Sequence, residues 1–234
     1  MNCQDYLDLI RSEYGLISVL SQKNGAVVLR MRHIASGKDM IVRRYDVPVP
    51  AYQAIQSVLH RHLPEIYDCI MCEDGQIVLE EYVEGISVSQ VLESGKYTYR
   101  GAKTVMIGLC KAVQTLHGMD IIHRDIKPEN ILISKDGTVK LIDLNASRKP
   151  SACKKQDTVI LGTIGYAPPE QYGVGQSDRR ADIYAMGVLL NVMLTGEHPS
   201  HRLARGKAGR IIKKCTLIDP NSRFSSVQKL MQAL

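Results

Sequence analysis

The sequence predicts an α+β fold with two lobes: a small antiparallel sheet of five strands with one short helix, then a mainly α-helical lobe. In the first part of the chain, short segments rich in Val, Ile and Leu alternate with turn-forming residues. From Ser87 onward, apolar residues instead recur at helical spacing. We therefore expect one domain made of two lobes, residues 1–83 and 84–234.

Five segments of the first lobe have the composition of β-strands, and turn formers such as Lys23-Asn24-Gly25 separate them. They are residues 14–20, 26–32, 40–44, 66–72 and 76–82. After the third segment, apolar residues at helical spacing predict a helix over 51–63, which Pro64 ends. In the second lobe the same spacing predicts helices over residues 88–94, 101–117, 182–194 and 203–216.

Composition narrows the class of protein. The 234 residues, 44% of them hydrophobic, can bury a substantial core. No apolar run is long enough to span a membrane, and the start lacks the basic and apolar layout of a signal peptide. These features predict a soluble cytoplasmic protein. The net charge of +6 is dispersed and aromatic residues make up only 5%, so we expect no nucleic-acid partner.

The six cysteines are scattered along the chain, and Cys69-x-x-Cys72 has no second pair to complete a zinc site. We expect all six to be free thiols with packing or surface roles. The sequence gives no indication of the oligomeric state.

The segment from His123 to Asn130 carries three chemically different groups in one short loop before an apolar strand. Asp125 can accept a hydroxyl proton, Lys127 can neutralise a transferring phosphoryl group, and Asn130 can hold a metal ion. A second carboxylate, Asp143, follows another apolar run and offers a further oxygen ligand. This combination favours phosphoryl transfer.

The motifs and their order are similar to those of eukaryotic-type (Hanks-type) Ser/Thr protein kinases, in a compact form with a degenerate N-terminal lobe. Residues 143–145 (Asp-Leu-Asn) stand where the family has Asp-Phe-Gly, and residues 167–170 (Ala-Pro-Pro-Glu) where it has Ala-Pro-Glu. Asp182 resembles the helix carboxylate that braces the family's catalytic loop. Arg223 resembles the arginine that pairs with Glu170.

The resemblance implies Mg²⁺- and ATP-dependent phosphoryl transfer to Ser or Thr hydroxyls of protein substrates, with Mn²⁺ as an alternative metal. Asp125, Lys127 and Asn130 would be the catalytic residues, and Asn130 and Asp143 would hold the metal. Lys127 resembles the Ser/Thr branch of the family rather than the tyrosine branch. Small-molecule kinases of related fold usually carry Gly in place of Arg124, which disfavours that alternative.

The first lobe departs from the family at its glycine-rich loop. That loop should run from Leu20 to Val28, but Ser21, Lys23 and Ala26 replace its three glycines. Because glycine lets the backbone approach phosphates closely, we expect a looser or differently shaped cover over the nucleotide. Leu20 and Val28 remain expected nucleotide contacts.

Arg43 stands where the family has the lysine that contacts the α- and β-phosphates, and Ile41 replaces the small alanine beside the adenine. Residues 47–64 contain no acidic residue, so the lysine's usual glutamate partner is missing. Glu80 falls at the back of the pocket, and we expect it to pair with Arg43, because an unpartnered buried carboxylate is costly. The alternative is that Glu80 points to solvent.

Three more residues complete the expected nucleotide site. Glu81 and Val83 would offer backbone groups to adenine, and Leu132 would contact the nucleotide from the strand after the catalytic loop. Within the activation-loop-like segment, phosphorylation of Thr158 would draw in Arg124, whereas a plain solvated loop is the alternative.

The missing glycines, Arg43 and Asn145 leave a second hypothesis open, namely a pseudokinase that acts as a nucleotide-modulated or nucleotide-independent protein-binding scaffold. Asp125, Lys127 and Asp143, which all survive, favour catalysis.

Overall fold

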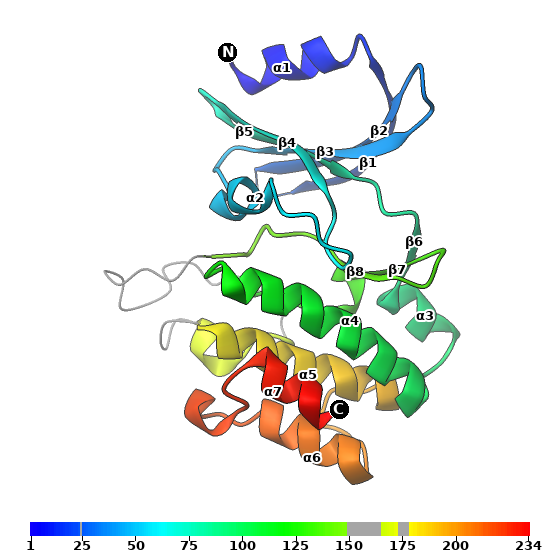
Figure 1. The fold of residues 1–234 in the computed structure, drawn as a ribbon, viewed down its shortest axis with the longest axis vertical. Coiled ribbons are helices and arrows are strands. Elements are labelled where there is room, and N and C mark those ends of the chain that lie inside the picture. The colour runs from blue at the N-terminus through cyan, green and yellow to red at the C-terminus, as the bar shows by residue number, and fades with distance from the viewer. Residues whose placement is uncertain (24, 149–164, 173–177) are drawn as a thin grey trace. The chain divides into compact units, whose positions relative to one another are not determined.

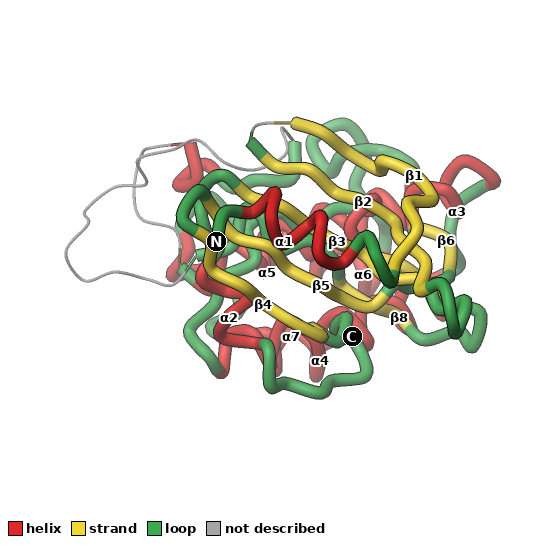
Figure 2. Tube along the Cα trace, turned by 90° about the horizontal axis from the view of Figure 1, so that it is seen from above, coloured by secondary structure: helices red, strands yellow, loops and turns green. Residues whose placement is uncertain are grey.

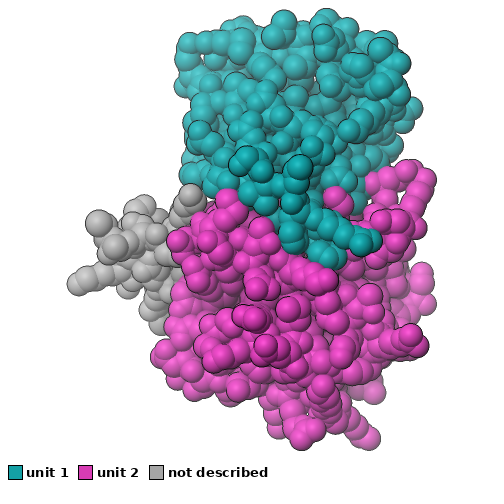
Figure 3. Space-filling model, viewed as in Figure 1, with its two compact units in different colours: residues 1–83 teal, residues 84–234 magenta. Residues whose placement is uncertain are grey.

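The structure is a computed structural model that describes residues 1–23, 25–148, 165–172 and 178–234. The chain divides into two compact units, Met1–Val83 and Glu84–Leu234, coloured separately in Figure 3. An antiparallel five-stranded sheet and several helices confirm the predicted α+β fold class. None of the helices in the described ranges has the length and apolarity that a membrane crossing requires.

The first unit is built on a five-stranded antiparallel sheet (Figure 1). Its order is β1-β2-β3-β5-β4, so each strand lies beside a neighbour in sequence except where β3 meets β5. All five predicted strands are present, with ends shifted by a few residues at most. The strands are β1 (Tyr14–Lys23), β2 (Ala26–His33), β3 (Asp39–Tyr45), β4 (Ile66–Cys72) and β5 (Gly75–Glu81).

The sheet has two buried faces with different partners. Helix α1 (Cys3–Ile10), drawn across the strands in Figure 2, buries Leu7 and Ile10 against one face, which includes Val42 and Leu79. Successive strand residues alternate between faces, so the residues next to these in sequence lie on the other side. Ladder pairing places Val28, Ile41, Arg43, Val78 and Glu80 together on that second face.

The two helices of the first unit differ from the prediction. Helix α2 (Pro50–Ile55) ends well short of residue 63. Val49 makes no side-chain cap at the start of α2, and Leu59, one turn after Ile55, is 80% exposed, so it contributes no core packing to a further turn. Helix α1 was not predicted at all. It begins with a capping box in which Asn2 accepts from the backbone of Asp5 and Asp5 accepts from that of Asn2.

The second unit combines a helical core with a small sheet. All four predicted helices are present, and α7 is an addition; they are α3 (Val88–Ser94), α4 (Tyr99–Gly118), α5 (Arg179–Thr195), α6 (Gly206–Cys215) and α7 (Val227–Ala233). Helix α4 packs against α5 and α7, and α6 packs against α5. The sheet has the order β6-β7-β8, from β6 (Gly85–Ser87), β7 (Ile131–Ser134) and β8 (Val139–Leu141). Three short 3₁₀ helices are η1 (Pro128–Asn130), η2 (Pro169–Tyr172) and η3 (Pro220–Ser222).

Helix α5 lies at the centre of this core, as its burial on all sides shows. It approaches α6 so closely that a Cβ added at Gly187 would lie 2.3 Å from Cβ of Cys215. Only glycine fits there. The first turn of α5 is thereby fixed in position, and that turn carries Asp182.

Candidate active site

Asp182 fixes the backbone at the start of the catalytic loop. It is fully buried in the first turn of α5. Its Oδ2 accepts from the backbone N–H of His123 at 3.0 Å, and its Oδ1 accepts from that of Arg124 at 2.8 Å. The ring Nε2 of His117 donates to Oδ2 at 2.8 Å. The bracing role that the family resemblance implied for Asp182 therefore corresponds to three observed hydrogen bonds.

Asp182 also makes stability depend on pH. Burial alone would raise its pKa, but the hydrogen bond and charge of His117 and the backbone N–H of Arg124 outweigh burial, so the pKa is lowered from 3.8. A carboxylate with a lowered folded-state pKa stabilises the protein above its unfolded-state pKa, and this contribution is lost as pH falls through the folded value.

We expect Asp182→Asn to lower the free energy of unfolding at neutral pH by about 1.5 to 3 kcal/mol, the range for one hydrogen bond to a charged group. The difference from wild type should shrink as pH falls below 3.8. Urea unfolding over a pH series measures both, and Glu93→Gln, which changes an exposed acid, is the control. A difference that stays constant with pH would contradict this role.

Arg124 adopts the left-handed backbone conformation, with φ of +67°. This conformation costs a non-glycine residue roughly 1 to 2 kcal/mol, so the surroundings must enforce it. Asp182 holds the Arg124 N–H, and the side chain of Gln171 donates to the Arg124 carbonyl at 2.7 Å. Neither Gln171 nor His117 is among the site residues predicted from the sequence. The only signal for His117 is a polar residue on an otherwise apolar helix face.

The three predicted catalytic side chains lie together in one hydrogen-bonded group. Nζ of Lys127 lies 2.8 Å from Oδ2 of Asp125. The side-chain nitrogen of Asn130 donates to the same oxygen at 3.0 Å and to the Asp125 carbonyl at 2.9 Å. Asp125 and Lys127 are partly exposed, whereas Asn130 is buried. Asp125 is therefore oriented from two sides and remains accessible to an incoming hydroxyl group.

Asp143 is positioned through the peptide of Ile142. The Ile142 N–H donates to the Asn130 carbonyl at 2.9 Å, and the ring Nε2 of His123 donates to the Ile142 carbonyl at 3.2 Å. Asp143 itself is left-handed, with φ of +68°. The predicted catalytic loop and the chain that follows β8 are therefore linked, because Asn130 contacts both Asp125 and Ile142, the residue before Asp143.

A buried ion pair joins Arg223 to Glu170, which lies in η2. Nη1 and Nη2 of Arg223 lie 2.6 and 3.0 Å from the two carboxylate oxygens of Glu170, an arrangement that gives a strong two-point contact. The Arg223 side chain is fully buried. The pairing predicted from the family resemblance is confirmed.

In the first unit, the predicted pair of Arg43 and Glu80 is present. Arg43 lies opposite Val78 in the ladder, which makes Glu80 its diagonal neighbour on the same face. Nε of Arg43 lies 2.6 Å from Oε1 of Glu80, and the side chains are only 6% and 4% exposed. The alternative in which Glu80 points to solvent is therefore wrong.

In the position of the glycine-rich loop, the residues on the two sides of the turn form a strand pair. Ser21 lies opposite Val28, and Lys23 lies opposite Ala26. At the turn, Gly25 has φ of +71°, and a Cβ there would lie 2.8 Å from the Asp46 carboxylate. The backbone is thus paired across the ladder where the family keeps open glycines.

The remaining expected nucleotide contacts fall at several places. Val28 and Ile41 share the sheet face of Arg43, whereas Leu20 lies at a register shift and is 53% exposed. The Glu81 N–H donates to the Glu65 carbonyl, so its carbonyl oxygen is the candidate contact. Buried Val83 ends the first unit, and half-buried Leu132 lies in β7 of the second. Thr158 lies outside the described residues.

Known proteins similar to this chain are kinases. Residues 50–232 match the family model of the protein kinase domain. The chain is 37% identical over 168 residues to serine/threonine-protein kinase PknL of Mycobacterium tuberculosis. The matched region covers 70% of this chain and 41% of PknL. It is 34% identical over 149 residues to serine/threonine-protein kinase PrkC of Bacillus subtilis, a match that covers 63% of this chain and 23% of PrkC. The probable serine/threonine-protein kinase PknB of Bifidobacterium longum is 38% identical over 159 residues, a match that covers 62% of this chain and 23% of PknB.

These relatives are much longer than the matching region. The chain spans 41% of PknL and 23% of PrkC and PknB. The similarity therefore covers only part of each of these relatives.

Proposed function

Because this chain belongs to the Ser/Thr protein kinase family, we propose that it transfers the γ-phosphoryl group of ATP, with Mg²⁺, to Ser or Thr hydroxyls of protein substrates. One observation carries the proposal: Asp125, Lys127 and Asn130 form a single hydrogen-bonded group tied to the segment before Asp143. A loose phosphoryl transition state needs positioning and charge neutralisation more than covalent chemistry. The hydrogen-bonded group around Asp125 offers both positioning and positive charge.

Each residue has a role that follows from its contacts. Asp125, oriented by Lys127 and Asn130, accepts the proton of the acceptor hydroxyl and directs its oxygen. Lys127, which is partly exposed beside it, offsets the negative charge of the transferring group. Because Lys127 also contacts Asp125, it helps to hold that carboxylate in position.

The oxygen donors of this unit fit Mg²⁺, which prefers hard oxygen ligands. The Asn130 nitrogen faces Asp125, so its amide oxygen is the candidate ligand, together with the Asp143 carboxylate. Mg²⁺ bound to ATP supplies charge neutralisation and alignment of the phosphates. In the first unit, Arg43 supplies a positive charge toward the nucleotide, and Glu80 fixes the direction of its guanidinium.

A pseudokinase is the second candidate, favoured by the pairing of residues 21–23 with residues 26–28 and by the ion pair of Arg43 with Glu80. In this alternative the chain binds a protein partner and uses nucleotide weakly. The intact group around Asp125 favours catalysis, since a scaffold has no use for it.

The deciding experiment incubates the purified chain with Mg²⁺, γ-labelled ATP and a basic protein substrate, with Asp125→Asn and Asp143→Asn in parallel. We expect label on Ser or Thr, located by mass spectrometry, that disappears in both variants. Absence of transfer with Mg²⁺ and Mn²⁺, together with no thermal shift on adding ATP, would establish the pseudokinase instead.

A further inference from the structure

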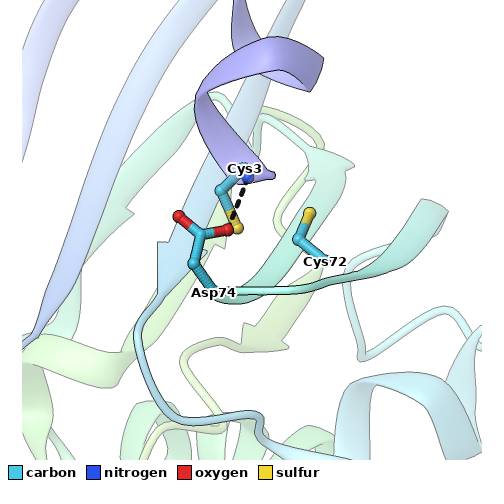
Figure 4. A group of neighbouring side chains, drawn as sticks. All are labelled: Cys3, Cys72 and Asp74. Atoms are coloured by element: carbon cyan, nitrogen blue, oxygen red, sulfur yellow. Dashed lines mark hydrogen bonds between the residues drawn. The ribbon is translucent and has the colours of Figure 1, made fainter. Parts of the chain in front are cut away.

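Three potential metal ligands of the first unit, one of them distant in sequence from the other two, meet at the start of helix α1. Cys3 is the first residue of α1, Cys72 ends β4, and Asp74 lies in the turn to β5. Figure 4 shows the three side chains beside one another, and their two sulfurs and a carboxylate oxygen all lie within 4.8 Å of one another. The active-site residues discussed above are not among them.

Local contacts hold this cluster in place. The backbone N–H of Cys3 donates to Oδ1 of Asp74 at 2.6 Å. Nη2 of Arg44 lies 3.4 Å from Oδ2 of Asp74. Cys3 is buried, Cys72 half-buried and Asp74 exposed, so the cluster opens toward solvent on the Asp74 side. A small ion can therefore enter without unfolding of the helix.

We propose that Cys3, Cys72 and Asp74 bind a thiolate-preferring divalent cation, with Zn²⁺ as the best fit. Zinc accepts sulfur and carboxylate ligands together, and a fourth position would be taken by water. Two thiolates and a carboxylate carry three negative charges, of which the cation offsets two. Arg44, which pairs with both Asp74 and Asp46, offsets part of the third.

A disulfide between the two cysteines is the competing use of the same geometry. Its formation removes two electrons and so requires an oxidant, whereas metal binding does not. A metal ion instead displaces the two thiol protons to solvent as it binds.

Binding would clamp α1 to the turn between β4 and β5. Helix α1 covers the sheet face that holds Val42 and Leu79. These residues are direct neighbours in sequence of Arg43 and Glu80, which lie on the opposite face. The cation would therefore stabilise the two strands that hold the buried ion pair.

The test uses the reduced, metal-free chain, titrated with Zn²⁺ against a chromophoric chelator and with Cd²⁺ to read the sulfur-to-metal charge-transfer band. We expect one cation per chain, a band typical of two thiolates and a raised unfolding temperature. Cys72→Ser and Asp74→Asn should weaken binding by at least the roughly 10- to 100-fold that loss of an outer-shell partner costs. Cys69→Ser, a half-buried cysteine that is not part of the cluster, is the matched control and should change nothing.

The thiolate band separates this site from the histidine pairs His60/His62 and His198/His201, which could also attract zinc but give no such band. Cys3→Ser is a supplementary variant, because loss of the buried thiol could disturb α1 by itself. No thiolate-bound cation in wild type would overturn the proposal. So would binding that survives Cys72→Ser or Asp74→Asn. A Cys3–Cys72 disulfide, detected as the loss of two hydrogens by mass spectrometry, with no cation bound after reduction, would replace it.

Discussion

Asp125→Asn is expected to reduce phosphoryl transfer by about 10²- to 10⁴-fold, the range for loss of a general base. Asparagine keeps the size of the side chain and can still accept from Asn130, but it cannot take the hydroxyl proton or pair with the charge of Lys127. The loss should appear in kcat, while ATP affinity stays close to that of wild type. Steady-state kinetics and an ATP-dependent thermal shift measure the two quantities separately.

Glu129→Gln is the matched control for this prediction. Glu129 is an acidic residue of the same loop, but it is exposed. Its removal changes the loop charge by the same amount and should leave kcat nearly unchanged. An equal loss in the two variants would show that the loop charge matters rather than the carboxylate of Asp125.

Arg43→Met and Glu80→Met should each lower the free energy of unfolding by about 3 to 5 kcal/mol, because each leaves one buried charge without its partner. The double variant Arg43→Met/Glu80→Met should regain most of this loss, since an apolar pair of similar volume often replaces a buried ion pair at little cost. Urea unfolding of the four proteins gives the coupling energy directly. Additive losses would show that the pair contributes little.

The same double variant distinguishes a structural role of Arg43 from a role in nucleotide binding. If Arg43 also contacts ATP phosphates, the refolded double variant should remain stable yet bind ATP much more weakly than wild type. Arg32→Met, which removes an exposed arginine from its bridge to Asp39, is the control and should affect neither quantity strongly. Full ATP affinity in the double variant would remove Arg43 from the nucleotide site.

The sequence by itself was sufficient for the fold class and the family, and it predicted three catalytic residues that lie in contact in the structure. Phosphoryl transfer needs particular functional groups at short spacing, so Asp125, Lys127 and Asn130 can be recognised within one loop. The pairing of Arg43 with Glu80 also followed from the sequence, because a buried charge requires a partner and the following helix offers none.

Only the tertiary structure decided what depends on contacts between distant residues. The length of α2 depended on whether Leu59 packs into a core. Leu59 is exposed, and the helix ends at Ile55. The roles of His117 and Gln171 rest on contacts with chain segments far from them in sequence. Cys72 was read with Cys69 because these are close in sequence, yet it meets Cys3 and Asp74. The spacing of residues within one loop indicates which functional groups that loop can bring together. Which distant side chains share a site depends on how the whole chain packs, and a short sequence pattern does not contain that information.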